Sequence, residues 1–168
     1  MNPLIRKAEA SDLSALVQLM RNTFEATYAY ANTAEDMQDY LDTHFRTEII
    51  AQELNTDFPC FVLETETGLV GYLMMGPSEL ETPFEGAVEL KRIYLAHAAK
   101  GKGWGKALLQ QGIDWASSNG YKGISLCVWQ QNTAAIAFYQ SQGFQVVEER
   151  KFILGKDVQD DFGMLLKF

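Results

Sequence analysis

The chain has 168 residues, of which 47% are hydrophobic and 21% charged, and its formal net charge is -8 at pH 7. This length and composition are typical of one folded domain with its own core, so we expect a single domain over residues 1–168. The acidic balance argues against nucleic acid as a partner, because nucleic-acid binding requires a basic face. The N-terminal part has no long apolar segment, which predicts no signal peptide, no membrane span and a cytoplasmic location.

Cysteine and histidine are too few to predict a metal site. Cys60 and Cys127 each fall in an apolar, strand-like segment, which predicts small buried side chains in a reducing compartment rather than a disulfide. The histidines are His44 and His97, and no C-x-x-C pair occurs. We therefore expect no zinc and no other metal.

The first half of the chain predicts one strand, a helical region and a hairpin. In chain order we expect a strand over 4–8, a helix over 12–21 capped by Ser11, a helical region over 34–45, a short helix over 49–54, and strands over 58–64 and 69–75 joined by the turn Thr65-Glu66-Thr67-Gly68. Residues 77–83 follow as a loop.

The second half alternates strands and helices. In chain order we expect a strand over 87–95, a glycine-rich turn, a helix over 104–118 ended by Asn119-Gly120, a strand over 124–128, a helix from Asn132 that Gly143 ends, and closing strands over 145–150 and 162–168. This order predicts a mixed α/β sheet.

The glycine-rich turn is Lys100-Gly101-Lys102-Gly103-Trp104-Gly105-Lys106. Alternating glycines let the backbone approach a ligand closely, because no Cβ stands in the way. No Ser, Thr, Asp or Asn is present to cap the N–H groups of the helix that follows. Free N–H groups, the positive end of a helix dipole and several lysines together predict an anion site, most simply for a phosphate.

The two common nucleotide-binding patterns do not fit this turn. A P-loop requires four residues between its glycines and Ser or Thr after the lysine, whereas Ala107 follows Lys106 and Lys100 occupies the position of the first glycine. A dinucleotide fingerprint requires G-x-G-x-x-G after the first strand of its unit, and this G-x-G-x-G comes after several strands.

A third pattern fits. Lys100-x-x-Gly103-x-Gly105 resembles the Q/R-x-x-G-x-G/A pyrophosphate loop of the GNAT superfamily of acyl-CoA-dependent N-acyltransferases, with Lys at the position usually held by Gln or Arg. The segment from Leu90 through Ile93-Tyr94-Leu95 resembles the family strand that pairs with pantetheine. Asn132, Phe138-Tyr139 and Gly143-Phe144 resemble the family's N…FY…GF helix.

The resemblance covers the whole chain and is closest to PaiA-type polyamine N-acetyltransferases. The stretches that carry this similarity are Phe24 to Tyr28, Tyr40-Leu41, Glu89 to Tyr94, Lys100 to Gly103, Val128-Trp129, Asn132, and Leu154-Gly155 with Asp157 and Gln159. The resemblance implies a GNAT fold of class α/β (α+β): a mixed, mostly antiparallel sheet of six to seven strands, about four flanking helices, and a splayed central strand pair that binds CoA.

The resemblance also implies an activity. The chain would move an acetyl group from acetyl-CoA to a primary amine by direct attack in a ternary complex, with spermidine or spermine as the preferred acceptor. A protein N-terminus, a lysine or an aminoglycoside is the alternative acceptor. An alternative of another class is a regulatory module that senses acyl-CoA without turnover.

The implied cofactor-binding residues lie on the central strand, the glycine turn and the following helices. They are Ile93, Tyr94, Leu95, Lys100, Gly101, Lys102, Gly103, Trp104, Gly105, Lys106, Asn132 and Phe138. A plain helix N-cap is an equally good interpretation of Asn132.

Two residues are the catalytic candidates. Tyr139 resembles the family's general acid, because a phenol of pKa about 10 can protonate the departing thiolate; a core tyrosine is the alternative. Glu89 lies where several family members carry a general base, and a surface Glu on a strand edge is equally compatible with its position. Glu residues of the 77–86 loop and His97 are the alternatives for the base.

The acceptor is expected to meet two segments, residues 24–45 and the loop 77–86. Both combine carboxylates with aromatic residues, a mixture that suits a small-molecule cationic amine as partner, although a solvated acidic face explains it equally well. The segment 162–168 is predicted as an exposed edge strand through which a homodimer would form.

Overall fold

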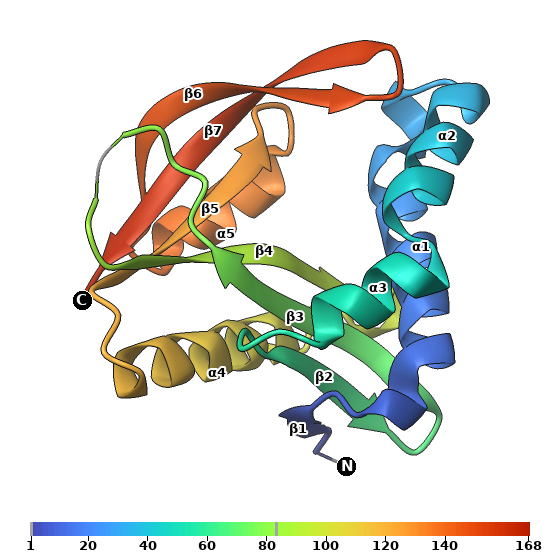
Figure 1. Ribbon diagram of the computed structural model, residues 1–168, viewed down its shortest axis with the longest axis horizontal. Coiled ribbons are helices and arrows are strands. Elements are labelled where there is room, and N and C mark those ends of the chain that lie inside the picture. Colours follow the sequence, from blue (N-terminus) through green and yellow to red (C-terminus); the bar gives the residue numbers. More distant parts are fainter. Residues whose placement is uncertain (1, 83) are drawn as a thin grey trace.

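The computed structural model describes residues 2–82 and 84–168 (Figure 1). One sheet contains all seven strands of the described part of the chain, in the order β1-β2-β3-β4-β5-β7-β6. They are β1 (Leu4–Lys7), β2 (Cys60–Thr65), β3 (Gly68–Pro77), β4 (Ala87–Leu95), β5 (Gly123–Trp129), β6 (Gln145–Leu154) and β7 (Asp157–Lys167). The α-helices are α1 (Leu13–Tyr28), α2 (Ala34–His44), α3 (Thr47–Leu54), α4 (Trp104–Ser118) and α5 (Thr133–Ser141). The expected fold class is confirmed.

The expected splay of the central strands is also present. Among the described strands, β4 and β5 form the one parallel pair, and every other pair is antiparallel. Their pairing stops after Glu89 and Ser125, although both strands continue for several residues. Figure 1 shows them diverging from that end. The two strands therefore separate after the pair Glu89–Ser125, and we call this opening between β4 and β5 the fork.

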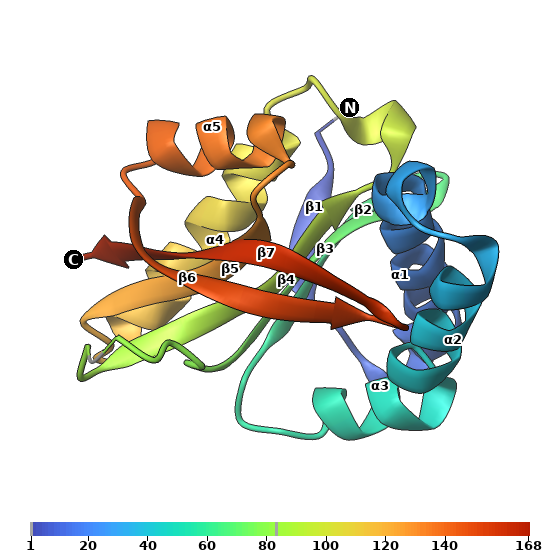
Figure 2. The ribbon, with the colours of Figure 1, turned by 90° about the horizontal axis from the view of Figure 1, so that it is seen from above.

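Helices cover both faces of the sheet and make two cores. One core packs under α4 and α5, and the other under α1, α2 and α3, as Figure 2 shows in projection. On β5 the alternation is strict: Ile124, Leu126 and Val128 join the first core. The intervening side chains of this strand therefore point toward α1, where Trp129 meets the rings of Tyr28 and Tyr30.

Strand β4 changes its facing at a bulge. Leu90 pairs with Met75 and Arg92 with Met74, so Lys91 is one extra residue on β4. Leu90 and Ile93 consequently face the same core under α4, while Arg92 lies over the Phe45 ring and Tyr94 packs on the other core. The bulge therefore changes which alternate residues of β4 face each core.

The first helix begins and ends differently from the prediction. Ser11 lies in a short 3-10 turn, and Asp12 rather than Ser11 organises the helix start: its carboxylate accepts from the Glu9 N–H at 2.7 Å and pairs with Arg6. At the other end the helix continues to Tyr28, because Phe24 and Tyr28 extend the apolar face with a four-residue period and pack on the core.

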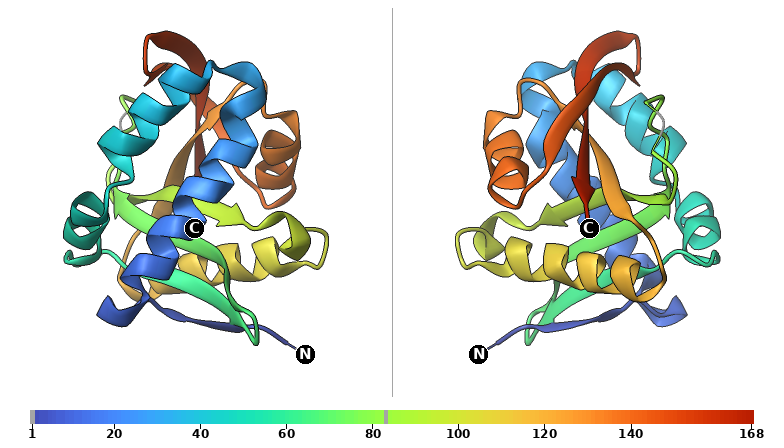
Figure 3. Two further views of the ribbon diagram at one scale, coloured as in Figure 1. Left: turned by 90° about the vertical axis from the view of Figure 1, so that its right-hand side faces the viewer. Right: turned by 90° about the vertical axis from the view of Figure 1, so that its left-hand side faces the viewer.

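The C-terminal hairpin is longer than predicted, and the expectation of an exposed edge strand there was wrong. Its strands pair up to Leu154 and Asp157 across a turn at Gly155, whose φ is +60°. Strand β7 lies between β5 and β6, so 162–168 is not an edge and offers no dimer contact of that kind. The sheet edges are β1 and β6, at opposite ends of the molecule in Figure 3. Pro83, the last residue of the expected 77–83 loop, lies outside the described residues.

Candidate active site

The glycine turn forms an uncapped helix start. Gly101 and Gly103 have φ of +74° and +78°, a conformation that residues with a Cβ rarely adopt. Gly103 is the N-cap residue of α4 and offers no side chain to the helix. The N–H groups of the first helical turn after it therefore have no partner within the helix. This geometry fits the predicted pyrophosphate site.

A cavity of about 720 Å³ runs from this turn through the strand fork to the aromatic residues on α1. It brings together most of the predicted cofactor-binding residues, namely Ile93, Tyr94, Leu95, Lys100, Gly101, Gly103, Gly105, Lys106, Asn132 and Phe138. Lys102 and Trp104 do not line it. Instead, the Lys102 ammonium lies 4.7 Å from the centre of the Trp104 ring, and that tryptophan packs on the core.

The fork makes main-chain groups of β4 accessible to a ligand. Beyond Glu89, the edge of β4 that faces β5 has no strand partner, and Ile93 and Leu95 line the cavity. Unpaired backbone groups on a strand edge can hydrogen-bond an extended chain, such as pantetheine. On α5, Asn132 accepts a hydrogen bond from the Ala135 N–H at 3.3 Å and also lines the cavity, so the N-cap and the cavity position coexist.

Tyr139 lines the same cavity. It lies in the second turn of α5, the helix that Asn132 caps. It is 8% exposed, and its ring packs edge-on against Phe144 with ring centres 5.7 Å apart. Burial raises the pKa of its hydroxyl above the usual value of 10. The phenol is therefore protonated at neutral pH, which is the state that a general acid requires.

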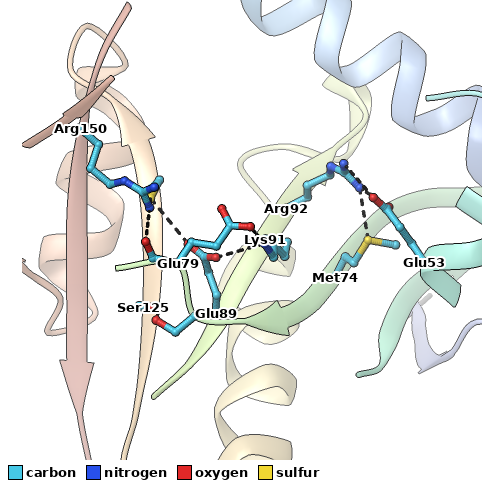
Figure 4. A network of polar contacts seen from close by, with 10 residues as sticks. Glu53, Met74, Glu79, Glu89, Lys91, Arg92, Ser125 and Arg150 are labelled. Atoms are coloured by element: carbon cyan, nitrogen blue, oxygen red, sulfur yellow. Dashed lines mark hydrogen bonds and ion pairs between the residues drawn. The ribbon is translucent and has the colours of Figure 1, made fainter. Parts of the chain in front are cut away.

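Glu89 is buried at the fork rather than exposed at a strand edge. It is 3% exposed and lies outside the cavity lining, but it contacts two residues of that lining. The Cys127 thiol donates to its Oε1 at 3.6 Å, and the Lys91 ammonium lies 3.4 Å from its Oε2. Figure 4 shows Lys91 between Glu89 and Glu79, whose carboxylate it meets at 2.5 Å. Burial raises the pKa of Glu89, and Lys91 opposes part of this effect.

Cys127 contradicts its predicted burial, whereas Cys60 is buried as predicted. Cys127 occupies an intervening position of β5, so its side chain points away from the core and lines the cavity. Desolvation of the thiol and the nearby Glu89 raise its pKa to about 12, and Arg150 opposes this shift. The sulfur is therefore a thiol at neutral pH and a poor nucleophile.

Several residues that line the cavities were not among the site residues predicted from the sequence. Arg92, Cys127 and Trp129 line the large cavity, and Arg150 and Asp161 line a smaller one of about 290 Å³. The alternation on β5 could have indicated Cys127 and Trp129, had the facing of that strand been known. Asp161 precedes the predicted start of the last strand, so the prediction did not place it.

Most acidic residues of the predicted acceptor segments serve other contacts or face solvent. Asp36 accepts from the Lys156 N–H at 3.1 Å, and Asp42 pairs with Arg21 at 2.9 Å. Glu79 lines the smaller cavity. Glu89 lies at the fork, Glu79 reaches it through Lys91, and Asp161 lines the smaller cavity beside Cys127.

The described residues contain neither a candidate metal site nor a candidate membrane-spanning helix. Residues 2–82 and 84–168 contain no group of three or more His, Cys, Asp or Glu side chains arranged to hold a metal ion. No helix in the same ranges combines the length and the apolar character needed to cross a membrane.

Comparison with known proteins agrees with this geometry. The acetyltransferase (GNAT) family matches residues 15–144. An uncharacterized N-acetyltransferase of Lactobacillus delbrueckii subsp. lactis is 30% identical over 94% of this chain and 93% of its own. The spermidine N(1)-acetyltransferase of Thermoplasma acidophilum is 26% identical over 84% of this chain and 88% of its own.

A solved structure extends the likeness to the whole fold. The PaiA N-acetyltransferase of Thermoplasma acidophilum, in complex with coenzyme A, superposes with a TM-score of 0.81 at 24% identity, covering all of both chains. The family match spans the bulged strand β4, the uncapped start of α4 and the Asn132–Tyr139 helix. This chain belongs to the acetyltransferase (GNAT) family and is an acetyl-CoA-dependent N-acyltransferase.

Proposed function

We propose that this enzyme acetylates a primary amine of a small polyamine, such as spermidine or spermine, by direct attack in a ternary complex. The observation that carries the proposal is the continuous cavity that joins the uncapped start of α4 to Tyr139 and the aromatic residues on α1. One end of this cavity suits an anion, and the aromatic faces of Tyr28, Tyr30 and Trp129 at the other end suit a cation.

The glycine turn and β4 hold the donor in this proposal. Backbone N–H groups after Gly103 bind the pyrophosphate, with Lys100 and Lys106 beside them. The free edge of β4 near Ile93 pairs with pantetheine, and one N–H there stabilises the negative charge that develops on the thioester oxygen. Acetyl-CoA supplies the activated acyl group.

Two side chains accept and donate the protons of the reaction in this proposal. Glu89 accepts a proton from the ammonium form of the acceptor, through Lys91 or a water at the fork, so that the nitrogen lone pair can attack the carbonyl carbon. The new C–N bond forms and the C–S bond breaks, and Tyr139 donates its proton to the leaving sulfur. The second proton of the attacking nitrogen then returns to the Tyr139 phenolate, which leaves the amide and restores the acid. The raised pKa of Glu89 favours proton uptake near neutral pH.

The similarity to a spermidine N(1)-acetyltransferase supports a polyamine as acceptor. An exposed amine on a protein, a free lysine or an aminoglycoside is the competing acceptor class. The test measures CoA thiol release from acetyl-CoA with 1,4-diaminobutane, spermidine, spermine, lysine, an N-terminal alanine peptide and an aminoglycoside, with an amine-free reaction as control.

We expect the highest kcat/KM with the polyamines. A preference for the alanine peptide or the aminoglycoside would replace the polyamine proposal with one of its alternatives. CoA binding without turnover on any amine would favour an acyl-CoA-sensing module.

A further inference from the structure

Three buried acceptor oxygens among the described residues accept no hydrogen bond. They are Oε2 of Glu89, which has the Lys91 ammonium 3.4 Å away, Oε1 of Gln159 and Oδ1 of Asp161, and the hydroxyl of Tyr72 is the fourth buried polar atom of this kind. A buried acceptor without a donor costs stability, so native proteins rarely retain one unless a ligand or water completes it. The common feature of the three oxygens is a need for N–H or O–H donors.

Asp161 is the most informative of them, because it lies in a cavity. Its side chain is 7% exposed and lines the 290 Å³ cavity, which shares Cys127 with the larger one. It lies opposite Trp129 on β5 and Arg150 on β6. The neighbouring Phe162 packs on the core under α4 and α5, so the Asp161 carboxylate points to the opposite face, toward α1 and α2.

The basic side chains around this cavity donate no hydrogen bond to Oδ1 of Asp161. Arg150 donates to the Glu79 carbonyl oxygen at 2.6 Å and contacts the Cys127 sulfur at 3.5 Å, and Lys151 pairs with Asp160. Both basic side chains also reach solvent. The unmet requirement is therefore for a donor that enters the cavity and reaches the buried carboxylate.

Cys127 lies between the two buried carboxyl groups. It contacts Glu89 directly, and it lines both cavities, the smaller of which Asp161 also lines. One molecule with two amino groups separated by a short methylene chain can therefore present one nitrogen at the fork and the other to Asp161. The rings of Tyr28 and Trp129, 5.8 Å apart between centres, border the same end of the large cavity and suit methylene groups and cations.

We propose that Asp161 binds the second, non-reacting ammonium group of a di- or polyamine acceptor. This inference rests on the proposed function, since it requires the reacting amine to lie at the fork. It assigns to Asp161 the discrimination between diamines and monoamines of equal length.

The test uses a matched pair of substrates and a matched pair of variants. The substrates are 1,4-diaminobutane and 1-aminobutane, which differ in the second ammonium group. The variants are Asp161→Asn and Asp160→Asn; Asp160 is the neighbouring exposed carboxylate, and it pairs with Lys151 on the surface. Thermal unfolding of both variants shows that each is folded.

We expect the wild type and Asp160→Asn to prefer the diamine. In Asp161→Asn the KM for the diamine should rise by about tenfold or more, since a charge-assisted hydrogen bond contributes that much, while turnover of the monoamine and CoA affinity stay unchanged. Equal loss on both substrates would assign Asp161 a structural role, and an unchanged diamine preference would overturn the inference.

Equilibrium binding separates this inference from the proposed function. Calorimetry with 1,4-diaminobutane in the presence of CoA needs no turnover. If the wild type acetylates neither amine, the proposed function fails, yet tighter binding of the diamine by the wild type than by Asp161→Asn still supports the site. Equal binding by both proteins overturns it.

Discussion

The Cys127 sulfur lies 3.6 Å from Oε1 of Glu89, immediately beyond the last residue pair that joins β4 to β5. This contact places a buried carboxyl group at the point where the sheet opens. It also contributes to the poor nucleophilicity of the cysteine, because desolvation of the thiol and the nearby carboxylate raise its pKa to about 12. A protonated thiol beside a carboxyl group favours the proposed direct attack by the amine over an acyl-cysteine.

Replacing Cys127 tests this conclusion. In direct attack the sulfur forms no bond to the acetyl group, so Cys127→Ala should retain most of the wild-type kcat. Mass spectrometry of the wild type mixed with acetyl-CoA alone should show no acetylated protein. An inactive Cys127→Ala together with a stable acetyl adduct on the wild type would indicate a covalent intermediate.

Tyr139→Phe removes the proposed general acid while keeping the ring that packs on Phe144. We expect kcat to fall by about a hundredfold or more, which is the usual contribution of a general acid, with CoA affinity nearly unchanged. Steady-state kinetics and CoA calorimetry measure the two quantities. The control is Tyr121→Phe, since Tyr121 packs against Trp115 and does not line the cavity. Full activity in Tyr139→Phe would make this tyrosine a core residue alone.

Glu89 should control the acidic limb of the pH profile. Because burial raises its pKa, the fraction of the basic form, and hence kcat/KM, should increase with pH above the usual carboxyl range. Glu89→Gln should lower the rate and remove this limb. A pH–rate profile that keeps the same limb in Glu89→Gln would assign the base to another group.

Glu79→Gln provides a graded test of the same network. Glu79 raises the pKa of Glu89, and it also engages the Lys91 ammonium at 2.5 Å. Without this carboxylate, Lys91 stabilises ionised Glu89 more strongly, so the pKa of Glu89 falls. The acidic limb should therefore move to lower pH with only a modest change in the maximal rate. A shift to higher pH would contradict the arrangement in Figure 4.

The sequence predicted the donor side of the site better than the acceptor side. The glycine turn, Asn132 and Tyr139 lie on contiguous motifs that resemble those of the GNAT family, and this resemblance implied a common site; the structure places all three in one cavity. The acceptor side depends on facing and on long-range pairing. Asp161 comes near Cys127 because β7 inserts between β5 and β6, and one extra residue, Lys91, changes which residues of β4 face each core. Neither feature has a local signature.

The bounds of helices and strands were likewise predictable only where contacts within the same segment determine them. The apolar period of α1 was visible up to Arg21, but its continuation to Tyr28 depends on aromatic packing with Tyr40 and Trp129 from distant segments. The hairpin turn at Gly155 is held from outside, by the Asp36 carboxylate of α2. Local propensity gives little indication of either contact.

Gly103 and Gly120 form a matched pair for the anion site. Both have positive φ, +78° and +82°, and a Cβ at either position would meet no atom within 4 Å. Replacement by alanine should therefore cost each about 1–2 kcal/mol of stability from backbone strain alone. Gly103→Ala should also weaken CoA binding, because it disturbs the N–H groups at the start of α4, whereas Gly120→Ala should leave CoA affinity unchanged. Thermal unfolding and CoA calorimetry measure the two effects, and equal CoA affinity in both variants would remove the backbone of Gly103 from the pyrophosphate site.

Asp161 should make the ligand-free protein less stable as pH rises. Burial raises its pKa to about 6, above the usual value of 3.8, so the folded state holds a proton that the unfolded state has already released. This contribution is present below pH 4 and is lost as pH rises through 6. The two-unit shift corresponds to about 3 kcal/mol at most, and Asp161→Asn should recover part of it at pH 7.5 but little at pH 4.5. Unfolding curves of the wild type, Asp161→Asn and Asp160→Asn at both pH values measure this difference. A destabilised Asp161→Asn at pH 7.5 would mean that the buried carboxylate is already satisfied by the protein, and that it has no need of an ammonium group.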